Sequence, residues 1–129
     1  MNFFINQYST LPRLKMKLVS NNDLDLDQFE ELLSISTVTF SMVDADTGIF
    51  RISNKAGSIE SKKSASNPLI NEYTIVYEWT KNDTAKVGNY IGEFKLDFLG
   101  ECSSLIVPIA EKLNIFIQGS ITKTTTQKI

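Results

Sequence analysis

Strict alternation between apolar and charged side chains is the feature that most constrains how this chain can fold. In residues 89–98, NYIGEFKLDF, aromatic and aliphatic residues alternate with glutamate, lysine and aspartate. Because successive side chains of an extended chain point to opposite faces, this pattern predicts a half-buried β-strand. Six other segments are also interpreted as strands: residues 12–19, 37–44, 49–53, 72–79, 103–108 and 113–121.

One segment indicates a helix. In NNDLDLDQFEELLS, Asp25 and Gln28 have the spacing of a capping box, and Leu24 and Phe29 have that of a hydrophobic staple. We expect a short helix at about 26–34 that packs over an edge or an open end of a sheet. About seven strands with regularly spaced turns, together with this helix, predict an all-β sandwich or barrel.

The chain of 129 residues has the length of a single domain. We place this domain at residues 12–121, after an N-terminal arm of residues 1–11 and before a C-terminal tail of residues 122–129. Residues 54–71 are polar, rich in serine, lysine and asparagine, and without a period. They are expected to form a long exposed loop, and long loops in compact domains often carry function.

Composition excludes several classes of function. The chain has no histidine and one cysteine, Cys102, so catalysis by Ser-His or Cys-His pairs and zinc sites built on these residues are excluded. The net charge of -2 offers no basic field for nucleic acid. No apolar run approaches the ~20 residues of a membrane span. We therefore expect a non-enzymatic protein with no catalytic residue, no cofactor and no metal, and with no nucleic-acid or membrane partner.

The acidic turn DADTG, residues 44–48, has some of the character of a calcium-binding loop. An EF-hand loop needs glycine at its sixth position and a carboxylate at its twelfth. Counting from Asp44, these positions hold Ile49 and Lys55. A hairpin turn between two strands, with Gly48 able to adopt a positive φ, is the favoured interpretation.

The segment between the last two aromatic-rich strands has the pattern of a tyrosine corner. Gly88 and Tyr90 stand at the start of the strand 89–98, and Asp83 lies five residues before Gly88. A tyrosine at this place can donate a hydrogen bond from its hydroxyl to the backbone of the preceding turn, as in Ig-like sandwiches. The pattern therefore favours an Ig-like β-sandwich.

The aromatic residues beside this corner have two interpretations. Tyr73, Tyr77 and Trp79 share one face of the segment 72–79 and could form an exposed platform for stacking sugar rings. However, Ile75 lies on the same face, and the next strand offers the rings of Phe94 and Phe98 as packing partners. Packing of Trp79 in the core is the favoured interpretation, and the sugar platform is the alternative.

The stretch YEWTKNDTAKVGNYIGEFKLDF, followed by a glycine turn and LIVP, resembles small Ig-like structural domains of tailed bacteriophages. An aromatic strand, a D-T-x-x-x-G-x-Y corner, an alternating strand and a closing V-P carry this resemblance. The matching residues are Tyr77, Trp79, Asp83, Thr84, Gly88, Tyr90, Phe94, Phe98, Gly100 and Pro108. The hairpin FSMVDADTGIFRISN is similar to the upstream hairpin of such proteins, including ones from crAss-like phages. The resemblance covers about residues 12–121, and N-terminal domains of phage baseplate proteins are similar.

The resemblance implies a non-enzymatic virion protein, such as a head-fibre or capsid decoration component, assembled in the host cytoplasm. Its partners would be other virion proteins of the capsid, the fibre or the region near the portal. The expected interface is the apolar part of the arm, because exposed apolar segments usually mark contacts; its residues are Phe3, Phe4, Ile5 and Tyr8. We also expect a homodimer, with a monomer as the alternative. A tail or baseplate adaptor and a carbohydrate-binding module are the alternative functions.

Overall fold

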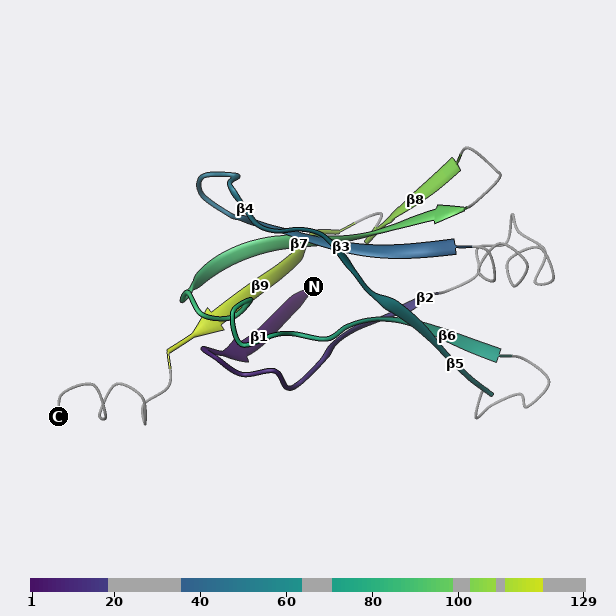
Figure 1. Ribbon diagram of the computed structural model, residues 1–129, viewed down its shortest axis with the longest axis horizontal. Helices are drawn as coiled ribbons and strands as arrows, with labels where there is room; N and C mark the ends of the chain where they lie inside the picture. The colour runs from purple at the N-terminus through teal and green to yellow at the C-terminus, as the bar shows by residue number, and fades with distance from the viewer. Residues whose placement is uncertain (19–35, 64–70, 99–102, 109–110, 120–129) are drawn as a thin grey trace, which may run out of the picture.

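The computed structural model describes residues 1–18, 36–63, 71–98, 103–108 and 111–119. This part of the chain is all-β and forms two sheets that face each other as an Ig-like sandwich (Figure 1). Its strands are β1 (Asn2–Asn6), β2 (Leu14–Leu18), β3 (Ser36–Asp44), β4 (Phe50–Ala56), β5 (Ser58–Lys63), β6 (Asn71–Tyr77), β7 (Gly88–Phe98), β8 (Ser103–Val107) and β9 (Leu113–Gln118). The helix expected at 26–34 and the tail 122–129 lie outside the described residues, as do Gly100 and Cys102.

The large sheet is built around β7, the strand with the strictest alternation. Its strand order is β1-β9-β7-β3-β4, and β8 also pairs with β7. One flank of β7 is shared, because β9 pairs with Gly88–Gly92 and β8 pairs with Phe94–Phe98. The small sheet is antiparallel, with the order β2-β6-β5. Strands β9, β7, β3 and β4 thus correspond to G, F, C and C′ of an Ig-like sandwich, and β2, β6 and β5 to B, E and D.

The N-terminal residues belong to the large sheet, so the prediction of a separate arm was wrong for residues 2–6. They form β1, which pairs in parallel with β9, and Asn2 lies opposite Asn114. The side chain of Ile5 is buried, and that of Phe3 packs against the core. The sequence NFFIN shows little alternation and its partner strand lies near the other end of the chain, so no local pattern reveals the pairing.

The prediction of a long loop at 54–71 was also wrong for residues 54–63. The chain runs through β4 and β5 as one extended segment that passes from the large sheet to the small sheet at Gly57 (Figure 1). A Cβ atom at Gly57 would lie 3.0 Å from Val38 Cγ1 and 3.0 Å from the Val76 carbonyl oxygen, so the crossing favours glycine. The polar sequence was misleading because β5 is an edge strand of the small sheet with largely exposed side chains. Residues 64–70 lie outside the described part.

The core lies between the sheets and is rich in aromatic rings. The Phe40 ring is 4.6 Å from that of Tyr77 and 5.0 Å from that of Phe94, measured between centroids. Trp79 is 3% exposed, and its ring contacts those of Phe3, Phe40 and Tyr77. Burial of Trp79 is therefore confirmed. With Tyr77 only 2% exposed and Tyr73 packed against the core, these rings form no exposed sugar platform.

Candidate functional site

The tyrosine corner is present at the start of β7. The hydroxyl of Tyr90 donates a hydrogen bond to the carbonyl oxygen of Lys86, at 2.9 Å. Gly88 lies against the Tyr90 ring, which a Cβ at that position would approach to 3.4 Å. This contact fixes the segment that enters β7, as the D-T-x-x-x-G-x-Y pattern predicted.

Asp83 is the polar centre of the same corner. Its carboxylate is 1% exposed; Oδ2 accepts hydrogen bonds from the Tyr77 hydroxyl at 2.7 Å and the Thr80 N–H at 2.9 Å. Oδ1 accepts a hydrogen bond from Lys55 Nζ at 2.9 Å. Burial alone would raise the pKa of Asp83, but these hydrogen bonds outweigh it and hold the pKa below its usual value. Burial, followed by the contact with this carboxylate, raises the pKa of Tyr77.

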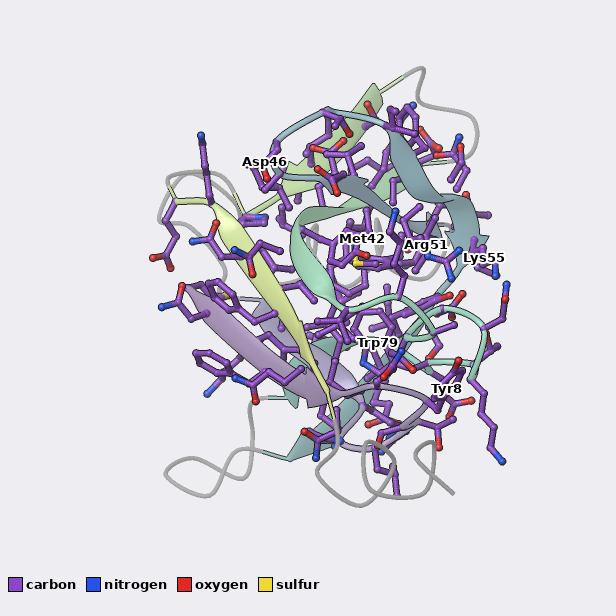
Figure 2. The ribbon with its side chains drawn as sticks, turned by 90° about the vertical axis from the view of Figure 1, so that its left-hand side faces the viewer. Tyr8, Met42, Asp46, Arg51, Lys55 and Trp79 are labelled. Carbon is purple, nitrogen blue, oxygen red and sulfur yellow. The ribbon has the colours of Figure 1, made fainter. Side chains whose placement is uncertain are left out.

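Two cationic side chains of β4 hold this corner against the large sheet. Lys55 binds Asp83, and the guanidinium of Arg51 donates from Nη2 to the carbonyl oxygen of Asn82. In Figure 2, Arg51 lies between the buried Met42 and the more exposed Lys55. Both oxygens of the Asp83 carboxylate thus accept hydrogen bonds that tie the corner to β4 and to the end of β6.

The outer face of the large sheet carries a row of apolar side chains. Strand register places Phe4 opposite Phe116, Ile91 opposite Val43, and Val43 opposite Phe50, with Phe116 diagonal to Ile91. Phe4 is 53% exposed and stacks on Phe116 with centroids 4.9 Å apart. At the other end of the row, Phe50 is 63% exposed. We call these five residues the apolar row: Phe4, Phe116, Ile91, Val43 and Phe50.

The outer face of the small sheet has a different character. Arg13 Nη1 lies 3.0 Å from a carboxylate oxygen of Glu60 and 3.5 Å from one of Glu78. Lys15 Nζ lies 4.0 Å from the other oxygen of Glu60. Such exposed ion pairs add little stability, but they keep this face solvated. The apolar row therefore distinguishes one face of the sandwich from the other.

A cleft of about 160 Å³ opens at the Phe50 end of the apolar row. It lies between the hairpin turn that joins β3 to β4 and the corner that enters β7, and backbone bonding holds the two together, since the Ala45 N–H donates to the Asn89 carbonyl oxygen at 3.0 Å. Gly48 takes a φ of 72° in this turn, as the hairpin interpretation expected. The residues that line the cleft are Asp44, Thr47, Ile49, Phe50, Arg51, Lys86 and Tyr90.

The structure separates the four residues expected to form the interface. Phe3 and Ile5 point into the sandwich, whereas Phe4 points outward into the apolar row. Tyr8 is partly exposed at a φ of 63°, and its N–H donates to the Thr84 carbonyl oxygen. Sequence reasoning missed the other members of the row, because their grouping depends on the pairing of five strands: β1 with β9, β9 with β7, β7 with β3, and β3 with β4. The only local indication was that Ile91 of β7 and Phe116 of β9 stand at outward positions of their strands.

The residues expected at the corner and in the core do come together. Trp79, Asp83, Tyr90 and Phe94 are buried, Phe98 packs against the core, and Gly88 adjoins Tyr90. Within the described ranges, no group of three or more Cys, Asp or Glu side chains is placed to hold a metal ion. The same part of the chain contains no helix long and apolar enough to cross a membrane. A scan against protein-family models finds no match to this chain, and a search of curated proteins finds no relative.

Proposed function

We propose that this chain is a non-enzymatic structural protein of a bacteriophage particle, a head-fibre or capsid decoration component that works through protein–protein contacts. The observation that carries the proposal is the apolar row, which crosses the large sheet from Phe4 to Phe50. The corner around Tyr90 resembles phage Ig-like domains. This resemblance is our reason for proposing a phage particle.

The physical argument starts from the cost of exposed apolar surface. Single exposed apolar residues are ordinary on proteins, but a contiguous row of them usually marks a contact. Phe4 and Phe50 stand at the two ends of this row and both expose more than half of their surface. Covering both rings would remove apolar area from water, which contributes about 25 cal/mol for each Å² buried.

A second copy of the chain is the occupant that we propose for this face. A twofold axis over the sheet would place one apolar row across the other, as sheets do when they pack face to face. The outward side chains of β7 beside the row alternate in sign, with Lys95 between Glu93 and Asp97. Under a twofold axis, the cation of one copy can meet an acidic residue of the other, so the face is complementary to itself.

The proposal is tested by asking whether the chain is part of a particle. Particles are purified by density-gradient centrifugation from cultures that produce them, and the chain is quantified by mass spectrometry relative to the major capsid protein. We expect the chain to follow the particle band at a fixed ratio in independent preparations. A chain that stays in the soluble fractions, while capsid protein reaches the particle band, would contradict the proposal.

A further inference from the structure

The cleft beside Phe50 has the features of a binding site for a small anionic group. Its lining carries two cationic residues, Arg51 and Lys86, and one acidic residue, Asp44. The side chains of Ile49 and Phe50 supply apolar walls, and both are largely exposed. A ligand that fits must therefore combine a negative charge with an apolar or neutral body.

Arg51 supplies the most specific signal. Its Nη2 is used by the Asn82 carbonyl oxygen, but its Nε is buried and, among the residues that the structure describes, has no hydrogen-bond acceptor. Buried polar groups in native proteins are nearly always hydrogen-bonded, and leaving one without a partner is costly. Arg51 lines the cleft, so an acceptor bound there would lie beside this incompletely satisfied guanidinium.

The acidic residue of the cleft does not fill that role. Oδ1 of Asp44 accepts the N–H groups of Asp46 and Thr47 at 2.9 and 3.0 Å, so this carboxylate caps its own turn. These backbone bonds lower the pKa of Asp44 and keep it ionised. The Tyr90 hydroxyl donates its proton to the Lys86 carbonyl oxygen. The donors left for a ligand belong to the guanidinium of Arg51, including its Nε, and to the ammonium group of Lys86.

Size and chemistry narrow the ligand to a carboxylate. A volume of about 160 Å³ is well below the ~300–1,000 Å³ of pockets for drug-sized molecules, but it admits one acidic side chain. A carboxylate accepts charge-assisted hydrogen bonds from arginine and lysine at once. We propose that the cleft formed by Arg51, Lys86 and the β3–β4 turn binds a carboxylate group, supplied by an acidic residue of a partner chain.

This inference is independent of the particle assignment and is tested on the isolated chain. The Nε–Hε signal of Arg51 is followed by NMR in ¹⁵N-labelled protein while acetate replaces chloride at constant ionic strength. We expect a saturable shift of this signal, with matching shifts at Thr47 and Lys86. A shift that grows linearly without saturating would overturn the inference.

Two lysine variants make the test specific. Lys86→Gln removes the cation from the cleft and is expected to weaken acetate binding by about tenfold. Lys81→Gln makes the same change on an exposed lysine of the neighbouring turn that does not line the cleft, and it should leave binding unchanged. Equal binding by the wild type and Lys86→Gln would contradict the proposed site. This variant keeps the Lys86 carbonyl that accepts from Tyr90, and it leaves Arg51 in contact with Asn82.

The source of the carboxylate is decided with capped tripeptides. Acetyl-Ala-Asp-Ala-amide is compared with acetate and with the same peptide containing Asn in place of Asp. Tighter binding of the aspartate peptide than of acetate assigns the cleft to a partner chain, because Ile49 and Phe50 then contact the flanking residues. Equal binding of the two assigns it to a free carboxylate. Equal binding of the Asn and Asp peptides would overturn a carboxylate site.

Discussion

Replacement of Asp83 by alanine tests whether the buried carboxylate holds the corner together. The carboxylate accepts a buried hydrogen bond from the Tyr77 hydroxyl at 2.7 Å and a partly buried one from the Thr80 N–H at 2.9 Å. A hydrogen bond to a charged group contributes about 1.5–3 kcal/mol. Lys55 is 47% exposed and can turn to solvent, so its ion pair adds only about 0–1 kcal/mol. Because neighbouring effects are not additive, we expect a loss of about 3–5 kcal/mol in the free energy of unfolding.

The pH dependence of this loss has a defined sign. The folded protein lowers the pKa of Asp83, since hydrogen bonds from Thr80, Lys55 and Tyr77 outweigh the effect of burial. Stability from a depressed carboxyl pKa is fully present above the unfolded value, about 3.9, and is lost as the pH falls through the folded value. The difference between the wild type and Asp83→Ala should therefore be constant near neutral pH and shrink below about pH 4.

Urea denaturation at several pH values measures this difference. The single tryptophan of the chain, Trp79, is buried beside Tyr77 and provides the fluorescence signal. The matched control is Asp46→Ala, which removes an exposed carboxylate from the hairpin turn and should change stability by less than about 0.5 kcal/mol. A loss below about 1 kcal/mol for Asp83→Ala would refute the reasoning. So would a difference that stays constant down to the most acidic conditions in which the protein is folded.

Three further variants and one control address the crossing, the corner and the exposed face. Gly57→Ala should destabilise the protein by about 1–3 kcal/mol, because the added Cβ meets the Val76 carbonyl oxygen and Val38; an unchanged urea midpoint would mean that the crossing does not require glycine. Tyr90→Phe should lower stability by about 1 kcal/mol by removing the bond to the Lys86 carbonyl oxygen, and no change would show that this bond is not stabilising. In sedimentation velocity at micromolar concentration, the wild type should sediment as a dimer and Phe4→Ser/Phe50→Ser as a monomer. Leu11→Ser, which alters a residue that is 70% exposed and lies outside the apolar row, should remain dimeric; a monomeric wild type would contradict the proposed dimer.

Strands with one fully buried face were predictable from the sequence, whereas the mostly polar β5 and the parallel β1 were not. In β3 and β7 the inward positions are apolar and most of the outward ones are polar, so the alternation indicates both the strand and the face that it buries. The residues of β5 are mostly polar because the strand lies at an edge, and β1 depends on a partner at the other end of the chain. Alternation within a segment does not indicate which distant strand pairs with it.

The same distinction separates the parts of the candidate site. The bond from Tyr90 to Lys86 spans four residues, so its sequence pattern could be recognised. The partners of Asp83 include Lys55 on β4, and the cleft needs the β3–β4 turn to meet the entry of β7. Both arise only when β4 and the corner are brought together by the fold, and neither has a local sequence signal. The apolar row likewise became visible only when strand register was known.

Competition between two forms of the chain for the same particles tests the role of the apolar row most directly. Wild type and Phe4→Ser/Phe50→Ser are produced together in particle-forming cells, and their ratio in purified particles is compared with that in the lysate by mass spectrometry. We expect the wild type to be enriched in particles by about tenfold or more, whereas Leu11→Ser should match the wild type. Equal incorporation of Phe4→Ser/Phe50→Ser would contradict the claim that this face makes the contacts on which function depends.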